Sequence, residues 1–140
     1  ASGLEARSLI DGSRLPPELW RAPRVGVSGG FVADGSRIAY VGADGRLIVL
    51  DRADGRPVVH PVGGAKAGTC PLLGYGAVLY AAEGGKIMRL PLDSGDGEAK
   101  GVEWLDASWL GQPATPMVMS ASAVYMGRTG WGLVRMGEAR

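Results

Sequence analysis

An Ala-Asp-Gly triplet that recurs at ten-residue steps constrains the fold of this chain more than any other feature. Its copies lie at 33–35, 43–45 and 53–55. Asp-Gly favours a hairpin turn because glycine adopts positive φ and the aspartate side chain caps its own turn. The segments between the turns, 36–42 and 46–52, have strand length and are rich in β-branched and aromatic residues. Residues 57–61, bounded by prolines, are typical of an outer edge strand. The sequence therefore predicts an antiparallel meander.

The composition agrees with short strands and excludes several classes of protein. Glycine supplies 24 of 140 residues, and each glycine inside a helix costs about 1 kcal/mol relative to alanine. Hydrophobic residues make up 46% of the chain and charged residues 21%, which excludes a disordered chain. The net charge of +1 gives no reason to expect a nucleic-acid partner. No apolar run approaches the roughly 20 residues of a membrane span.

The meander recurs twice downstream, so the chain is built from repeats. Tyr40, Tyr80 and Tyr125 occupy one position of the repeat, at spacings of 40 and 45 residues. An apolar segment that would form the innermost strand precedes each tyrosine strand, at 24–27, 69–73 and 115–119. A period of 40–45 residues with short antiparallel strands is that of one β-propeller blade.

We therefore predict an all-β fold over residues 1–140: an incomplete β-propeller of about three four-stranded antiparallel blades. The expected blade repeats are 17–56, 57–101 and 102–140, and residues 1–16 would be the outer strand or strands of a neighbouring or closing blade. Propellers use about 4–8 blades, so three leave open faces and unpaired strand edges. Two completions stay open: other copies of this chain, with two chains per six-bladed ring, or the rest of a larger propeller protein.

Several motifs resemble the blades of pyrroloquinoline-quinone-type (PQQ-like) β-propellers. Residues 40–45 and 50–55, Tyr-Val-Gly-Ala-Asp-Gly and Leu-Asp-Arg-Ala-Asp-Gly, follow that pattern; Asp96-Gly97 with Trp104, and Asp11-Gly12 with Trp20, repeat its ending. Residues 34–40 also resemble the WD40-like blades of TolB-type propellers. The resemblance implies that tryptophans pack one blade against the next. It also favours an extracytoplasmic location, periplasmic or secreted, which the residues alone leave unknown.

Catalytic and metal-binding patterns give little support for an enzyme. His60 and Cys70 are the single histidine and cysteine, so a disulfide or a zinc site of several such ligands has no basis. The acidic stretch 93–98 lacks the spacing of a calcium loop. The glycine-rich segments 26–30 and 63–68 are expected to be connecting loops, because no helix follows them to bind phosphate. We expect no catalytic set, no metal and no cofactor.

The residues expected to matter fall into two groups. Those expected to pack the blades together are Tyr40, Tyr80, Tyr125, Trp20, Trp104 and Trp131. Those that would serve binding are Trp109, Arg21 and Arg24, because arginine recognises carboxylates and is common at interfaces. The function predicted is a non-catalytic scaffold or binding module for protein–protein interaction or assembly. The alternatives are a glycan-binding, lectin-like propeller and a fragment of a PQQ-dependent dehydrogenase.

Overall fold

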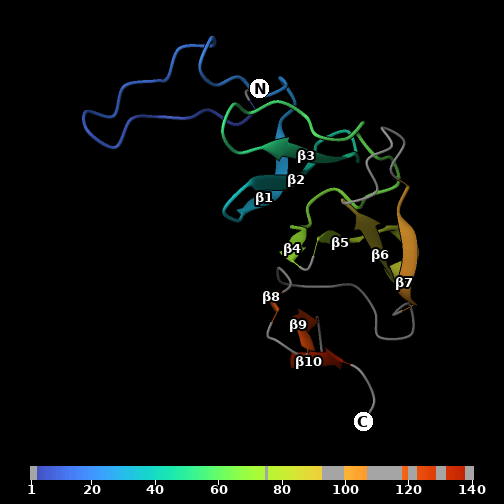
Figure 1. Ribbon diagram of the computed structural model, residues 1–140. Helices are drawn as coiled ribbons and strands as arrows, with labels where there is room; N and C mark the ends of the chain where they lie inside the picture. The colour runs from blue at the N-terminus through green and yellow to red at the C-terminus, as the bar shows by residue number, and fades with distance from the viewer. Residues whose placement is uncertain are drawn as a thin grey trace.

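The computed structural model describes residues 3–74, 76–92, 100–106, 118–119, 123–128 and 132–137. It contains three antiparallel sheets, which follow one another along the chain (Figure 1). Within the described residues the only helical element is a short 3₁₀ turn, η1 (Glu83–Gly85). The predicted all-β class is therefore confirmed.

The first sheet has the strand order β1-β2-β3, with β1 at Val27–Ala33, β2 at Arg37–Gly42 and β3 at Leu47–Asp51. Tyr40 stands in the middle of the sheet, opposite Phe31 on β1 and Ile48 on β3. Isolated bridges from Leu47 to Val62 and from Leu50 to Pro57 extend the sheet outward. The proline-bounded segment 57–61 thus lies at the outer edge of the first sheet, as its missing backbone donors predicted.

The second sheet has four strands in sequential order: β4 (Leu72–Gly74), β5 (Ala77–Ala81), β6 (Lys86–Pro91) and β7 (Val102–Asp106). The third sheet has the order β10-β9-β8, with strands β8 (Val118–Met119), β9 (Ala123–Arg128) and β10 (Gly132–Gly137). Each sheet is therefore a meander in which neighbours in sequence are neighbours in space.

The innermost strands bring the three sheets together. Strand β4 contacts β1 and β2 of the first sheet, and it also contacts β8 of the third. In the second and third sheets this contact is made by the first strand of the meander, and in the first sheet by its first two strands; the last strands of the meanders take no part in it. Sheets that meet at their first strands are arranged as the blades of a propeller.

The expected position of the innermost strands was wrong in detail. The first was expected at 24–27 but forms at Val27–Ala33, and the segment 26–30, expected to be a loop, supplies part of it. The ladder is irregular between Val27 and Phe31. A side chain at Gly29 would lie 2.5 Å from the backbone carbon of Gly68. These glycines therefore let the strand bulge and approach another backbone, a role that resembles a loop in sequence.

The first blade is buried on both faces, and successive side chains of its strands point to opposite faces. Ala39 and Val41 belong to a cluster with Val78, Tyr80 and Leu90 of the second sheet. The opposite face carries Tyr40, Ile48 and Leu50, which pack with Val27 and Ile38 of the same sheet and are covered by Leu4, Ala22 and Val25. Because both faces are covered, β2 and β3 read as nearly continuous apolar runs.

We expect Leu47→Ala to destabilise the protein by about 2–5 kcal/mol, because Leu47 is fully buried between the first two sheets and truncation leaves a cavity there. The free energy of unfolding from urea titration measures this loss. Leu19→Ala is the control, since Leu19 is 62% exposed, and it should cost less than about 0.5 kcal/mol. Equal losses in the two variants would show that the inter-blade cluster does not stabilise the fold.

Candidate functional site

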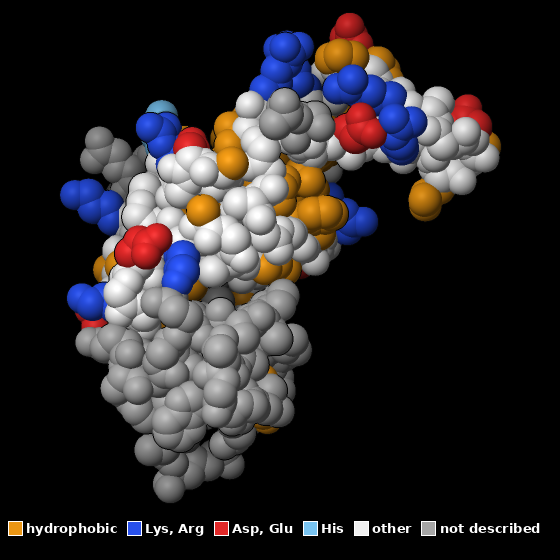
Figure 2. Space-filling model, turned by 180° about the vertical axis from the view of Figure 1, so that it is seen from behind, with side chains coloured by type: hydrophobic (Ala, Val, Ile, Leu, Met, Phe, Trp, Pro, Cys, Tyr) orange, Lys and Arg blue, Asp and Glu red, His pale blue; other side chains and the backbone are white. Residues whose placement is uncertain are grey.

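Residues 5–16 form an arm that projects from the first sheet (Figures 1 and 2). A bridge between Arg7 and Arg14 makes it a two-stranded ribbon, and the Leu15 amide donates to the Ala6 carbonyl at 2.9 Å. Leu9 and Ile10, at the tip, are fully exposed. Exposed large apolar side chains at the end of a projecting ribbon are a feature of contact surfaces.

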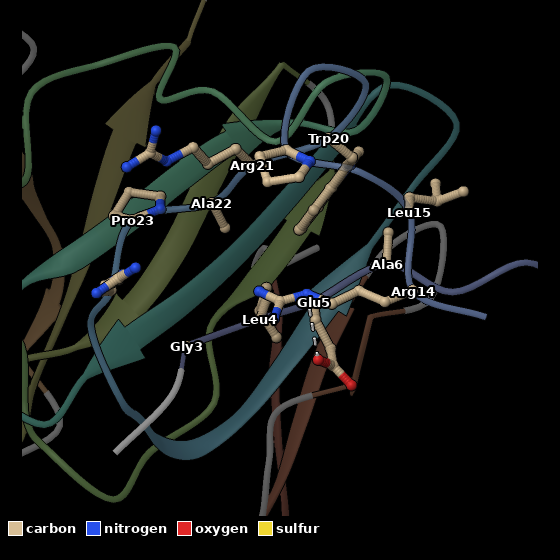
Figure 3. Close-up of a pocket in the computed structure, with 12 residues that line it drawn as sticks. Gly3, Leu4, Glu5, Ala6, Arg14, Leu15, Trp20, Arg21, Ala22 and Pro23 are labelled. Carbon is tan, nitrogen blue, oxygen red and sulfur yellow. Dashed lines mark ion pairs between the residues drawn. The ribbon is translucent and has the colours of Figure 1, made fainter. Parts of the chain in front are cut away.

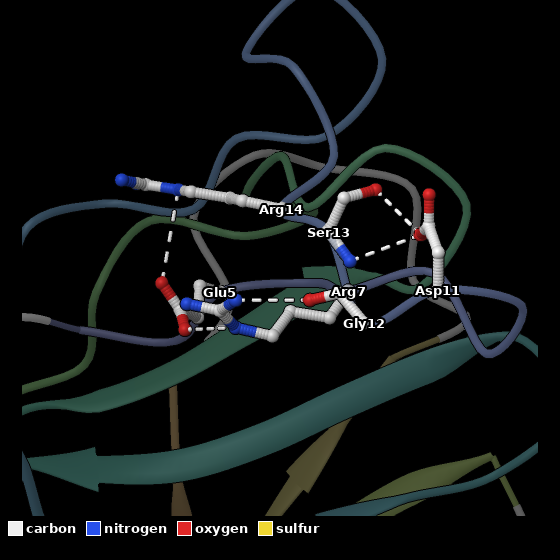
Figure 4. A network of polar contacts seen from close by, with 6 residues as sticks. All are labelled: Glu5, Arg7, Asp11, Gly12, Ser13 and Arg14. Atoms are coloured by element: carbon white, nitrogen blue, oxygen red, sulfur yellow. Dashed lines mark hydrogen bonds and ion pairs between the residues drawn. The ribbon is translucent and has the colours of Figure 1, made fainter.

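Polar contacts stiffen the arm (Figure 4). The Glu5 carboxylate accepts a hydrogen bond from Arg7 at 2.7 Å and faces Arg14 at 3.7 Å. The hydrogen bond and charge of Arg7 hold the pKa of Glu5 below its usual value. At the tip, the backbone and side chain of Ser13 donate to Asp11, and these bonds lower the pKa of that carboxyl. The arm thus has a defined conformation of its own.

The turn at the tip of the arm is closed by three hydrogen bonds. The Gly12 amide donates to the Ser8 carbonyl at 2.9 Å, and the Ser8 amide donates to the Ser13 carbonyl at 2.8 Å. The Ser13 amide donates to the Asp11 carboxylate at 3.0 Å. Gly12 has φ of +74°, the left-handed conformation that glycine adopts without steric cost.

The outer turn of the first blade repeats this geometry bond for bond. The Gly55 amide donates to the Asp51 carbonyl at 2.8 Å, and the Asp51 amide donates to the Arg56 carbonyl at 2.7 Å. The Arg56 amide donates to the Asp54 carboxylate at 2.9 Å, and Gly55 has φ of +76°. The arm tip therefore has the structure of a blade's outer turn.

The Gly55 turn receives a tryptophan from the preceding segment of the chain. The indole Nε1 of Trp20 donates to the Arg52 carbonyl at 2.9 Å, and Trp20 is 9% exposed. A Cβ added to Gly55 would lie 2.9 Å from the indole ring, so the ring rests directly on the glycine. Trp20 thus joins the N-terminal segment to the outer turn of the first blade.

A cavity of about 570 Å³ opens where the arm meets the first sheet (Figure 3). Its apolar lining includes Leu4, Leu15 and Trp20, and its charged lining comprises Glu5, Arg14, Arg21 and Arg24. Orange side chains gather beneath the arm in Figure 2, where the arm joins the body. The cavity therefore combines apolar surface with an excess of positive charge.

The structure brings Arg21 and Arg24, both predicted as binding residues, to this one cavity. Both are exposed, and within the described part of the chain neither forms an ion pair with a carboxylate. Arg14 has a carboxylate partner, but its Nε lies 3.7 Å from the Glu5 carboxylate, which is too far for a hydrogen bond. Guanidinium groups left without a carboxylate are suited to bidentate recognition of one from a partner.

The three repeat tyrosines lie on the second strands of their blades. Tyr40 and Tyr80 are buried, and burial raises the pKa of each phenol. The Tyr40 hydroxyl has no hydrogen-bond partner within the described part of the chain, whereas the Tyr80 hydroxyl lies against Gly101. Tyr125 is half-buried on β9, opposite Val118 and Arg135.

Trp104 lies on β7 at an irregular point of the ladder. Met88 pairs with Glu103 and Ile87 with Leu105, so Trp104 is an extra residue at a β-bulge. It is 41% exposed, in contrast to Trp20. Bulges redirect side chains, and here the bulge leaves the indole accessible. Trp109, Trp131 and the acidic stretch 93–98 lie outside the described residues.

The remaining candidates are the single cysteine and the single histidine. Cys70 is a buried free thiol whose pKa is raised by burial, and His60 is exposed. The described segments hold no group of three or more His, Cys, Asp or Glu side chains with metal-binding geometry. In those segments no helix is long and apolar enough to cross a membrane.

The sequence did not predict how Trp20 docks on the first blade or which residues line the cavity. The Arg52 carbonyl and the open face of Gly55 are backbone features, which residue type does not reveal. Leu4, Glu5 and Arg14 line the cavity only because the arm folds back on itself. One signal was available: Asp11-Gly12 and Asp54-Gly55 are the same dipeptide, each followed by a residue whose amide the aspartate caps.

Comparison with solved structures identifies the fold. No protein-family profile matches the chain, and neither does any curated protein. BamB from Moraxella catarrhalis matches with a TM-score of 0.61 at 19% identity, over 81% of this chain and 34% of BamB. Two computationally designed proteins also match: Ika8 (TM-score 0.52, 12% identity, 85% of this chain and 48% of that one) and Ika4 (0.54, 11%, 86% and 96%).

These likenesses show the fold alone. The match to BamB supports a β-propeller, and the chain spans about a third of BamB's length. With three antiparallel blades joined at their inner strands, the chain is an incomplete β-propeller, as predicted.

We expect Gly55→Ala to destabilise the protein by about 2 kcal/mol more than Gly64→Ala. Both glycines have positive φ, +76° and +82°, so alanine at either costs roughly 1–2 kcal/mol of backbone strain. Only at Gly55 does the added methyl displace an indole, that of Trp20, since nothing lies within 4 Å of the Cβ position at Gly64. Urea unfolding and the red shift of tryptophan emission measure the difference, and equal losses would contradict the docking.

We expect Tyr40→Phe to move alkaline unfolding to higher pH. Burial, with a smaller contribution from the Asp44 carboxylate, raises the folded-state pKa of Tyr40. The stability associated with the protonated phenol is therefore complete below about pH 10 and is lost as the pH rises through the folded-state value. Phenylalanine removes this titration and the unpaired hydroxyl together. Circular dichroism across an alkaline titration tests it, and an unchanged or lower midpoint would refute it.

Proposed function

We propose that this chain acts as a non-catalytic β-propeller module for protein–protein interaction, with the cavity at the base of the arm as its binding site. The observation that carries the proposal is a pair of guanidinium groups, Arg21 and Arg24, that have no carboxylate partner among the described residues and line a cavity with apolar and charged walls. The propeller fold is consistent with it, because propellers present loops and blade edges to other molecules.

The chemistry of the cavity defines the partner. Carboxylates pair with Arg21 and Arg24 in bidentate hydrogen bonds, and apolar side chains contact Leu4 and Leu15. The partner segment is therefore an acidic peptide with interspersed leucine-type residues. Glu5 is already paired with Arg7 at 2.7 Å, so its charge repels such a segment only weakly.

We expect the double variant Arg21→Gln/Arg24→Gln to weaken binding of a fluorescent acidic, leucine-containing peptide by about tenfold or more. Two charge-assisted hydrogen-bonding groups are lost, and each is worth roughly 1.5–3 kcal/mol. Fluorescence anisotropy measures the affinity, which should also fall with added salt. Arg46→Gln is the control, because Arg46 is exposed and lies 3.8 Å from Asp44, outside the cavity. Unchanged affinity in the double variant would exclude the cavity as the site.

A second function, glycan binding, is favoured by one observation only. Trp104 presents an accessible indole beside Glu103 on the bulged strand β7, and sugars stack on such rings. Oligosaccharide titration followed by tryptophan fluorescence, in the parent chain and in Trp104→Ala, separates this function from peptide binding at the arm.

A further inference from the structure

The contact between Trp20 and Gly55 defines what an outer turn of this protein accepts. It supplies a flat glycine surface for the indole and a carbonyl, that of Arg52, for the indole N–H. The docked tryptophan comes from the segment that precedes the blade. The turn and the tryptophan thus have complementary surfaces, and their contact joins the preceding segment to the blade.

The arm carries a second turn of this kind without its tryptophan. The hydrogen bonds and the glycine φ at Ser8–Ser13 match those at Asp51–Arg56. Yet no described atom lies within 4 Å of a Cβ position at Gly12. The equivalent of the Arg52 carbonyl is the carbonyl of Leu9, whose side chain is fully exposed.

Among the described residues, Trp104 has no glycine turn packed on its indole as Trp20 has. It follows Asp96-Gly97 in the repeat as Trp20 follows Asp11-Gly12, but it is 41% exposed where Trp20 is 9% exposed. The arm tip and β7 also hold four of the seven large exposed hydrophobic side chains among the described residues: Leu9, Ile10, Val102 and Trp104. Both surfaces therefore have apolar area to bury.

The two surfaces lie on opposite sides of the molecule in Figure 1, with the arm beyond the first sheet and β7 at the outer edge of the second. From this arrangement and the Trp20–Gly55 precedent we infer that two copies of this chain associate. The Trp104 indole of each copy docks on the Gly12 turn of the other. Two such contacts are related by a two-fold axis and close the assembly. The inference goes beyond the proposed function, because it involves the tip of the arm and β7 and not the cavity at the base of the arm.

Association is tested by analytical ultracentrifugation of the whole chain over a range of concentrations. The parent chain should reach twice its 14.5 kDa mass reversibly. Trp104→Ala and Gly12→Asn should each raise the dimer dissociation constant by at least about 30-fold, as expected for a buried aromatic anchor. Asparagine tolerates positive φ, so the turn persists while its surface is blocked. Phe31→Ala is the control: Phe31 is an aromatic residue 54% exposed on the inner strand β1, and its loss should leave the constant unchanged.

Mixing the two variants separates docking from damage to the fold. Gly12→Asn keeps its tryptophan and Trp104→Ala keeps its glycine turn, so a mixed pair retains one of the two contacts while either variant alone retains none. The mixture should therefore dimerise more tightly than each variant by itself. A monomer at every concentration, a dimer insensitive to both substitutions, or no recovery on mixing would overturn the inference.

Acidic-peptide binding distinguishes failure of this inference from failure of the proposed function. Trp104→Ala leaves the cavity residues Arg21 and Arg24 in place, so it should bind the peptide as the parent chain does. A monomeric chain that still binds the peptide refutes the second-copy contact alone. Loss of peptide binding only in the Arg21→Gln/Arg24→Gln variant, together with a normal dimer, supports both.

Discussion

The first blade of this protein depends on having a neighbour on both faces. A short meander buries too little apolar surface to be stable alone, and a sheet with two apolar faces needs two covers. The first blade has both: the second sheet packs on Ala39 and Val41, and residues of the N-terminal segment pack on Tyr40, Ile48 and Leu50. That requirement explains the apolar character of β2 and β3 and the way the chain before β1 folds across the blade.

The docked tryptophan, Trp20, is the second contact that joins the N-terminal segment to the first blade. Trp20 fixes the segment before β1 to the outer turn of the first blade by ring contact with Gly55 and by its bond to the Arg52 carbonyl. This contact orients the arm and places Arg21 and Arg24, which follow directly in the chain, at the rim of the cavity. The packing of Trp20 on the first blade thus also shapes the candidate binding site. Stability of the N-terminal segment and placement of the cavity arginines depend on the same side chain.

The fold class was predictable because its signals are local. Asp-Gly turns and the strand-length apolar runs 36–42 and 46–52 located β2 and β3 to within one residue at each end. The inner strand β1 was misplaced because Gly29 serves a close approach to Gly68, a tertiary cause with no local signature. The cavity was not predictable, since it exists only when Leu4 and Arg14 meet across the arm. Arg21 and Arg24 were predicted as binding residues from the chemistry of arginine alone, and the cavity that both of them line was not foreseen.

Hydrogen exchange measured by mass spectrometry at low and high protein concentration is the most direct test of this account. It measures whether cover on both faces stabilises the first blade and whether a second copy docks on the turn at the tip of the arm. The account predicts the slowest exchange in β2 and β3, which are covered on both sides. It predicts fast exchange of the arm amides at low concentration and clear protection of the Ser8–Ser13 turn at high concentration. Uniform exchange across the sheets, or an arm tip unaffected by concentration, would contradict it.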